Sequence, residues 1–392
     1  MALRYIDSLE LAGIRAFIRA DFNVPLKDGR ITDATRIEAA LPTIQWAIAN
    51  GAHTILASHL GRPKGKPDPK LTLRPVAERL AEILHLKVVL APDCVGPEVE
   101  HMSRTLDRRE VLLLENLRFH PEEEANDPTF ARQLAALADV YVNDAFGAAH
   151  RAHASTEGMA RYVPIRAAGF LMRKEVEALS KVLVDPERPV VVVLGGAKVS
   201  DKIKVIENLL PRVDALLIGG AMAYTFLRAA GHAIGDSLVE EDRLEVAREV
   251  LAHAKQGGAT VQLPLDHLVT ADVSGAAPTR EVGTDIPAGL KGVDIGPRTI
   301  EAYRREIARA RTVFWNGPVG IFEVEAFSRG TMAIANALAD SRAITVVGGG
   351  DSIAALARSG RSDDITHIST GGGASLEFLE GCALPGLTVL EQ

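Results

Sequence analysis

The residues best suited to chemistry in this sequence are glycines and lysines that follow an apolar run within Pro189–Ile203, PVVVVLGGAKVSDKI. Gly195 and Gly196 end the run, and Lys198 and Lys202 follow where a helical pattern begins. Glycine turns let backbone N–H groups approach an anion closely, and a following helix start favours negative charge. Because the spacing differs from the P-loop pattern G-x-x-x-x-G-K-[ST], the segment predicts a phosphate site of another kind.

Four more glycine turns follow apolar runs in the second half of the chain. They read GGAM at 219–222, NGPVG at 316–320, GGGDS at 348–352 and STGGGAS at 369–375. One such turn can simply connect a strand to a helix, whereas five after successive strands predict an extended polyphosphate. Asp351 and Ser352 add hard oxygen groups of the kind that a nucleotide-bound Mg²⁺ uses, although Asp351 is alternatively a helix N-cap. The absence of G-x-G-x-x-G argues against a dinucleotide site.

Polar and basic residues follow the apolar runs in the first half of the chain. They are Asp21 and Asn23, His59 and Arg62 in SHLGRP, Arg118 and His120 in ENLRFH, and His150, Arg151 and His153 in AHRAH, with Arg36 opening a helical segment. Because parallel strands end at one edge of a sheet, these residues together predict a small-anion site, whereas each arginine alone could be an ordinary surface residue. His150 and His153 also fit an i, i+3 metal pair, but no Cys, Asp or Glu lies at ligand spacing, so the anion pocket is favoured.

Composition and charge restrict where the chain works and what it binds. Of its 392 residues, 47% are hydrophobic and 24% charged, as in globular proteins, and the net charge of -7 argues against binding to nucleic acid or to an anionic membrane surface. Cys94 and Cys382, the two cysteines, lie far apart, which favours a reducing compartment over a disulfide framework. The first residues show no signal-peptide core and no apolar run is long enough to span a bilayer, so we expect a cytoplasmic protein.

The elements that must position these residues alternate between short apolar runs and amphipathic stretches. The candidate strands are 15–23, 53–59, 87–92, 110–119, 140–144, 189–196, 215–220, 260–264, 312–318 and 344–350. Their continuous apolar character predicts parallel strands buried on both faces and wound with helices. The rhythm breaks at 167–189, where a long helical stretch ends in a link rich in Pro and charge. About ten strands with one break favour two α/β domains joined by a helix over a single (β/α)₈ barrel.

Eight segments, in order along nearly the whole chain, resemble the phosphoglycerate kinase family. They read RADFNVP, SHLGRP, ENLRFH, VNDAFGAAHRAH, LGGAKVSDKI, WNGPVGIFE, GGGDS and STGGGASLEFLEG. The resemblance implies reversible, Mg²⁺-dependent transfer of the 1-phosphoryl group of 1,3-bisphosphoglycerate to ADP, giving ATP and 3-phosphoglycerate, by direct in-line transfer in a closed interdomain cleft. It also implies a monomer of two Rossmann-like domains, each a parallel sheet wound with helices. These would be a phosphoglycerate-binding domain (1–168 plus 379–392), a hinge helix (169–185) and a nucleotide-binding domain (186–378).

The resemblance also assigns roles to residues of this sequence. For phosphoglycerate it implies Asp21, Asn23, Arg36, His59, Arg62, Arg118 and Arg151. For the nucleotide it implies Lys202, Gly220, Ala221, Gly292, Asn316, Glu323, Gly349, Gly350, Asp351 and Ser352, with Asp351 holding the metal. Around the transferring phosphoryl group it implies Arg36, Lys198 and the amides of Gly371 and Gly372.

Two departures from the family pattern are small. Ala221 stands where the family commonly has a third glycine, near the expected adenine position, and Ser352 replaces the commoner threonine while keeping the hydroxyl. Two other readings share part of the pattern: another two-domain nucleotide-dependent kinase or ligase, and a non-catalytic phosphometabolite-binding protein. The second would not need Lys198 or Asp351, and both residues are present.

Overall fold

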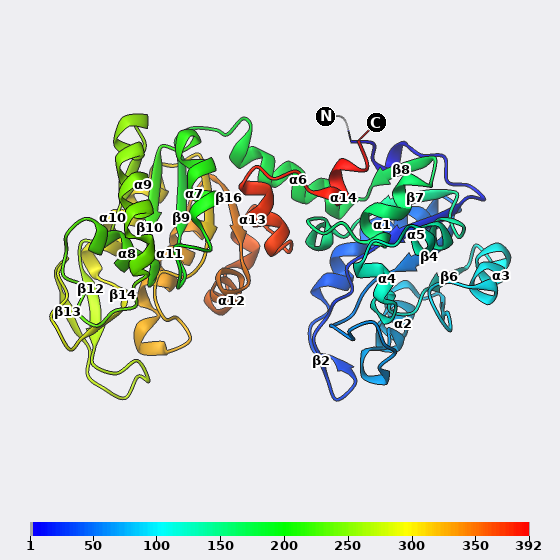
Figure 1. The fold of residues 1–392 in the computed structure, drawn as a ribbon, viewed down its shortest axis with the longest axis horizontal. Coiled ribbons are helices and arrows are strands. Elements are labelled where there is room, and N and C mark those ends of the chain that lie inside the picture. Colours follow the sequence, from blue (N-terminus) through cyan, green and yellow to red (C-terminus); the bar gives the residue numbers. More distant parts are fainter. Residues whose placement is uncertain (1–2, 392) are drawn as a thin grey trace. The chain divides into compact units, whose positions relative to one another are not determined.

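The structure, a computed structural model, describes residues 3–391 and divides the chain into two compact units. Unit 1 holds the chain up to Val176 together with the segment from Ala383 onward, and unit 2 holds Glu177–Cys382. The boundary falls inside helix α6 (Phe170–Leu183), which connects the two (Figure 1). No helix within 3–391 is long and apolar enough to cross a membrane.

Unit 1 is built on a six-stranded parallel sheet in the order β5-β6-β4-β1-β7-β8. Its strands are β1 (Arg15–Arg19), β4 (His53–Ala57), β5 (Lys87–Leu90), β6 (Glu110–Leu113), β7 (Val140–Asn143) and β8 (Ile165–Ala168). Its helices are α1 (Thr35–Ala49), α2 (Arg74–Leu84), α3 (Pro97–Thr105), α4 (Pro121–Glu124), α5 (Pro128–Ala135) and α14 (Pro385–Thr388). The last of these joins unit 1 through Gly386, whose N–H donates to the Ala149 carbonyl at 2.9 Å.

Unit 2 repeats the plan with a second six-stranded parallel sheet, in the order β11-β10-β9-β15-β16-β17. Its strands are β9 (Val190–Leu194), β10 (Ala215–Ile218), β11 (Thr260–Gln262), β15 (Thr312–Asn316), β16 (Ile344–Gly348) and β17 (His367–Ile368). Its helices are α7 (Ile203–Leu209), α8 (Met222–Ala229), α9 (Leu244–Gly257), α10 (Pro297–Arg309), α11 (Arg329–Ala339), α12 (Gly350–Ser359) and α13 (Gly373–Leu379). The predicted α/β class with two parallel sheets is therefore confirmed (Figure 1).

The pattern of buried side chains in these segments matches the repeat of the strand or helix that each one forms. Every residue of β9 and of β15 is buried, as expected for central strands covered on both faces. Helix α10 begins with Pro297 in its first turn and buries Ile300, Tyr303 and Ile307, which the 3.6-residue repeat places on one face. These side chains pack with the second sheet into one hydrophobic core.

Some strands are shorter than the apolar runs predict. The run 110–119 forms only β6 and then a 3₁₀ turn at Leu117–Phe119. The cause is Asn116, whose side chain accepts from the Arg118 N–H at 3.1 Å and donates to the carbonyls of Leu60 and Leu71 at 2.8 and 2.9 Å. The run 15–23 likewise ends as a strand at Arg19.

Two small antiparallel sheets were not predicted. One pairs β12 (His267–Thr270) with β13 (Arg280–Val282) and β14 (Lys291–Ile295), and the other pairs β2 (Leu26–Lys27) with β3 (Arg30–Ile31). The short strands β8 and β17 were also missed. None of these strands is a continuous apolar run like those of the central strands. β2, β3, β13 and β17 have two or three residues, and β8, β12 and β14, with four or five, contain charged or polar residues.

The order of strands reverses at one place in each parallel sheet. In unit 1 the chain runs from β1 toward β4 on one side and later from β7 toward β8 on the other. In unit 2 the same reversal separates β9 from β15. Ligands of open α/β sheets bind outside the carboxyl ends of the strands at such points, so the ends of β1, β7, β9 and β15 are where a site is expected.

Candidate functional site

The edge of unit 1 at the carboxyl end of β1 holds Asp21 and Asn23. Asp21 is only 8% exposed and forms an ion pair with Arg36, which comes from the first turn of α1. Asn23 Oδ1 accepts a hydrogen bond of 2.8 Å from the Gly61 N–H, so it ties this edge to the loop after β4. The Asp21 carboxylate thus holds the Arg36 guanidinium at the edge of the sheet, where four of its five N–H donors remain for a ligand.

His59 and Arg118 lie deep in the same edge. Arg118 is 5% exposed, and its Nη1 donates to the Gly61 carbonyl at 2.8 Å. Burial of His59 and the nearby charges of Arg19, Arg118, Arg36 and Arg151 hold the pKa of His59 well below its ordinary value. The imidazole is therefore neutral at pH 7, and the arginines that follow separate strands converge around it.

Arg151 and Arg62 have different surroundings. Arg151 follows β7, and its Nε donates to His150 Nε2 at 3.0 Å. Arg62 is exposed and makes no hydrogen bond or ion pair with any residue between 3 and 391. Arg36, Arg118 and Arg151 are thus near enough for their charges to lower the pKa of His59, whereas Arg62, three residues further along the loop, is not among these charges.

Sequence reasoning missed a buried network beneath these residues. Arg19 is 1% exposed, and it donates from Nε to Ser155 Oγ at 2.8 Å and from Nη2 to His59 Nδ1 at 3.1 Å. Because arginine only donates, Nδ1 must accept, and the proton of neutral His59 lies on Nε2. The available signal was a charged residue inside the apolar run 16–20.

Glu123 completes this network from helix α4. Its carboxylate is 1% exposed and accepts from the Ser155 N–H at 2.9 Å and from the Ser155 hydroxyl at 2.5 Å. Burial raises the pKa of Glu123, while the charge of Arg19 opposes that rise. Burial and the surrounding arginines lower the pKa of His153 to about 4. A neutral His153 among arginines fits the anion pocket, and His153 belongs to no group of three metal ligands among the described residues.

Two cavities open beside the carboxyl ends of the strands in unit 2. The predicted residues that line the first, of about 350 Å³, are Gly220, Ala221, Gly292, Glu323 and Asp351. Those that line the second, of about 550 Å³, are Lys198, Lys202, Asn316, Gly349, Gly350, Asp351, Ser352 and Gly372. Both cavities are lined by Gly196, Ala197, Pro318 and Asp351, so they adjoin. Gly371 lines neither of them and is buried.

The first cavity also has an apolar wall that sequence reasoning missed. Tyr224, Leu238 and Val273 line it, and Leu238 and Val273 are 56% and 41% exposed. Apolar side chains that stay exposed beside a cavity fit a flat, largely apolar ring, whereas the second cavity offers lysines and glycine amides to negative charge. Together the two cavities have the chemistry needed for a base and for its phosphates.

The two lysines after β9 differ in burial and contacts. Lys202 lies at the start of α7, and its ammonium donates to Asn316 Oδ1 at the end of β15. Burial lowers the pKa of Lys202, and the charges of Asp201 and, to a smaller extent, Asp351 partly offset this effect. Lys198 is exposed and has no hydrogen bond or ion pair to another residue in 3–391. Lys202 is thus held in place, whereas the ammonium of Lys198 remains available to a ligand.

The glycine turns after β9 and β15 lie against each other. Gly195 N–H donates to the Asn316 carbonyl and Gly196 N–H to the Pro318 carbonyl, both at 2.9 Å. A side chain at Gly195 would place its Cβ 2.1 Å from the Pro318 oxygen, and Gly317 has φ +93°. Only glycine allows this approach, which forms the floor of the second cavity.

Asp351 and Ser352 begin helix α12 but have different surroundings. Asp351 is exposed, and no cation of the described chain forms an ion pair with it. Ser352 is fully buried, and its Oγ accepts from the Gly317 N–H at 2.5 Å, so this hydroxyl supports the turn. Gly371 N–H donates to Ser369 Oγ at a long 3.4 Å, and Gly372 has φ +55°. The Asp351 carboxylate, open beside both cavities, fits a hard cation such as Mg²⁺.

Known proteins resemble this chain over its whole length. The profile of the family described as phosphoglycerate kinase matches residues 6–382. Proteins named phosphoglycerate kinase from Anaeromyxobacter sp. (strain K) and Moorella thermoacetica are 60% and 58% identical, and each alignment covers all of both chains. The solved structure of phosphoglycerate kinase from Coxiella burnetii superposes with a TM-score of 0.93 at 42% identity, covering 99% of each chain. Each of the two parallel sheets has polar residues at the carboxyl ends of its strands, as described above. The similarity in sequence and in fold shows that the chain belongs to the phosphoglycerate kinase family.

Proposed function

We propose that this protein transfers the 1-phosphoryl group of 1,3-bisphosphoglycerate to ADP, reversibly, with unit 1 binding the phosphoglycerate and unit 2 the nucleotide. The observation that carries the proposal is that all ten predicted nucleotide residues line two adjoining cavities, with Asp351 in the wall of both. The arginines grouped around His59 in a chain of net charge -7 support the anionic partner substrate.

The reaction needs positioning and charge neutralisation rather than a general base. In the direction of ATP synthesis an oxygen of the ADP β-phosphate attacks the phosphorus of the acyl phosphate, and the carboxylate of 3-phosphoglycerate leaves. In reverse, the carboxylate attacks the γ-phosphate, and with a reference pKa near 3.5 it is already ionised at neutral pH. The neutral state of His59 and His153 is compatible with a reaction in which no side chain removes a proton.

The catalytic groups we propose are Arg36, Lys198 and the amides of Gly371 and Gly372. Asp21 orients Arg36, and Lys198 is exposed beside the second cavity, so both cations can face the transferring oxygens. Asp351 would hold Mg²⁺, which when bound neutralises charge on the nucleotide phosphates. Lys202 and Asn316 would hold the nucleotide from the floor of the same cavity.

In-line transfer requires the two bound substrates to meet, so we propose that the two units close when both substrates are bound. Small-angle scattering should show a smaller radius of gyration with 3-phosphoglycerate and a non-hydrolysable Mg²⁺–ATP analogue together than with either alone. An unchanged radius with both ligands at saturation would argue against closure.

The function itself is tested by a coupled assay with 3-phosphoglycerate and ATP, in which formation of ADP is followed. Turnover is expected with 3-phosphoglycerate and not with glycerate, which lacks the 3-phosphate that the arginines of unit 1 would bind. Turnover of a different small acid in preference would favour another small-molecule kinase. Binding of both ligands with no turnover in either direction would favour a non-catalytic phosphometabolite-binding protein.

A further inference from the structure

Three potential metal ligands of different chemistry meet at the outer side of the sheet in unit 1. Asp93 and Cys94 follow β5, and His120 follows β6 and its 3₁₀ turn. These strands are parallel neighbours, with Leu90 opposite Leu113, so their carboxyl ends bring the three residues together. Among the described residues this is the one group of at least three His, Cys, Asp or Glu whose ligand atoms lie within 4.8 Å of one another.

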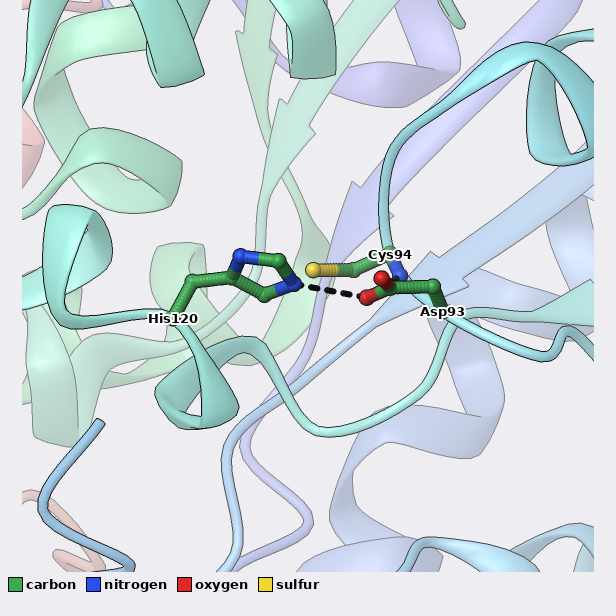
Figure 2. Close-up of side chains that lie close together, drawn as sticks. All are labelled: Asp93, Cys94 and His120. Atoms are coloured by element: carbon green, nitrogen blue, oxygen red, sulfur yellow. Dashed lines mark hydrogen bonds and ion pairs between the residues drawn. The ribbon is translucent and has the colours of Figure 1, made fainter. Parts of the chain in front are cut away.

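The three side chains point toward a common position (Figure 2). His120 Nε2 donates to Asp93 Oδ1 at 2.7 Å, and the same oxygen accepts from the Cys94 N–H at 2.7 Å. The Cys94 side chain is fully buried, whereas those of Asp93 and His120 are 48% and 27% exposed. The group therefore has a buried sulfur on one side and an opening to solvent on the other.

Neighbouring residues fix the imidazole of His120. Its ring stacks on Phe130 of α5, with centroids 5.1 Å apart and an angle of 27° between the planes. A Glu122 carboxylate oxygen lies 4.0 Å from the second ring nitrogen, Nδ1. Metal-binding histidines commonly donate a hydrogen bond from the nitrogen that does not face the metal, and Glu122, at 4.0 Å, is the carboxylate that would have to move closer to accept it.

We propose that Asp93, Cys94 and His120 bind one zinc ion, with water from the exposed side as the fourth ligand. Thiolate, imidazole and carboxylate are ligands that zinc accepts, whereas Mg²⁺ and Ca²⁺ prefer oxygen alone. In a tetrahedral site with ordinary zinc bond lengths, ligand atoms lie about 3.4 to 3.6 Å apart. Asp93 Oδ1 and His120 Nε2 therefore need to separate from 2.7 Å to about 3.4 Å, which is a small movement on half-exposed loops.

Charge and protons balance in this site. The Asp93 carboxylate and the Cys94 thiolate neutralise the two positive charges of the ion. Burial and the nearby carboxylates of Asp93 and Glu123 raise the pKa of the Cys94 thiol, so without metal the sulfur keeps its proton. On binding, the thiol proton is released to solvent. The proton on His120 Nε2, now shared with Asp93, also leaves that nitrogen: a neutral ring takes up a proton at Nδ1, and an imidazolium already carries one there, so the ligand is a neutral imidazole in either case. The sequence groups His120 with the residues of the expected small-anion site, but His120, Asp93 and Cys94 are not among the groups proposed to contact substrate. The inference therefore stands apart from the proposed function.

The test is titration of the untagged, metal-free full chain with Co²⁺ and Zn²⁺, without nucleotide. Co²⁺ should give one equivalent of a near-ultraviolet thiolate-to-cobalt charge-transfer band, and Zn²⁺ should abolish it by displacement. The band should be lost in Cys94→Ala and kept in Cys382→Ala, which removes the exposed cysteine outside the group. Asp93→Asn, a change at a half-exposed side chain, should weaken Zn²⁺ binding by at least about tenfold, as measured by competition with a chromophoric chelator.

Three results would overturn the proposal. They are no thiolate band in the wild-type chain, a band that survives in Cys94→Ala, and loss of the band in Cys382→Ala. If Cys94→Ala does not fold, the proposal is tested instead by the Zn²⁺ affinity of Asp93→Asn and by the shift in melting temperature that Zn²⁺ causes. Zn²⁺ should raise the melting temperature of the wild-type chain more than that of Asp93→Asn, and equal shifts would contradict the site.

Discussion

Lys198 and Lys202 lie four residues apart after β9, and their contacts differ. Lys202 is partly buried and donates to Asn316, so its position is set by the protein before any ligand binds. Lys198 is exposed at the second cavity with no described partner, so its ammonium is free to follow charge that develops on a ligand. An interaction that forms mainly in the transition state raises kcat rather than lowering KM.

We expect Lys198→Ala to lower kcat by at least about 10²-fold, with little change in either KM, because loss of one preorganised donor costs about this much in other enzymes. Steady-state kinetics in the coupled assay measures both quantities. Lys204→Ala, which removes an exposed lysine from the neighbouring helix α7, is the matched control and should leave kcat unchanged. A Lys198→Ala enzyme with more than about a tenth of the wild-type kcat would remove Lys198 from the transition state.

The contact between the turns after β9 and β15 fixes two secondary-structure elements relative to each other, because it holds the ends of the two strands together. We expect Gly195→Ala to destabilise unit 2 by about 1–3 kcal/mol, because the new methyl group would meet the backbone oxygens of Pro318 and Gly317 at 2.1 and 2.6 Å. Nucleotide affinity should fall as well, because these turns line the second cavity. Chemical denaturation and nucleotide titration measure the two effects.

Gly257→Ala is the control for this substitution. Gly257 is the last residue of α9, and a Cβ there would meet nothing within 4 Å. Alanine should be neutral or stabilise unit 2 by up to about 1 kcal/mol. If Gly195→Ala were as stable as Gly257→Ala and bound nucleotide normally, the close contact of the two turns would not matter for the site.

The start of α6 depends on a buried carboxyl group. Asp144 is fully buried, its Oδ1 accepts from the Met172 N–H at 3.1 Å, and burial raises its pKa to about 7 from an ordinary 3.8. The folded state therefore holds this proton more tightly than the unfolded state. The contribution of this proton to the free energy of unfolding is fully present below about pH 4. It is lost as the pH rises from about 4 to about 7, and it does not change further above that.

Asp144→Asn should remove this part of the pH dependence of unit 1 between about pH 4 and 7. Urea midpoints can be followed by the fluorescence of Trp46, whose ring lies 5.6 Å from that of Phe170 in α6, in a Trp315→Phe background. Asp139→Asn is the control with the opposite sign, because hydrogen bonds from Arg15 lower the pKa of Asp139 and its contribution is lost at low pH. An unchanged slope in Asp144→Asn would contradict the assignment.

At the scale of the whole molecule, each unit has its own hydrophobic core and one of the two tryptophans. Trp46 lies in α1 of unit 1, and Trp315 is fully buried in β15 of unit 2. Single-tryptophan variants therefore report on the units separately.

We expect 3-phosphoglycerate to stabilise chiefly the transition reported by Trp46, and Mg²⁺–ADP the one reported by Trp315. A ligand that binds only the folded state at 100 times its Kd stabilises that state by about 2.7 kcal/mol. Denaturation monitored by fluorescence, with each ligand in turn, measures the shifts. The proposal that unit 1 binds phosphoglycerate and unit 2 the nucleotide would be contradicted if each ligand shifted mainly the other transition, or if each ligand shifted both transitions equally.

Much of the fold and of the site was predictable because the signals are local. Continuous apolar runs such as Val190–Leu194 mark buried parallel strands, and the residues that follow them must lie at one edge of the sheet. For this reason the sequence identifies the glycines, the lysines and Asp351 of unit 2 as one group, and they line two adjoining cavities in the structure. The antiparallel sheet of β12, β13 and β14 was missed because each of its strands contains charged or polar residues and none is a continuous apolar run.

The sequence by itself determined which side chains stand at the strand ends, since strand period and residue type are properties of neighbouring residues. Only the tertiary structure decided which of them meet. Arg19 reaches His59 because β1 and β4 are adjacent, and Asp93 reaches His120 because β5 pairs with β6 at the side of the sheet. Strand order is set by packing across the whole unit, so no spacing in the sequence predicts these contacts.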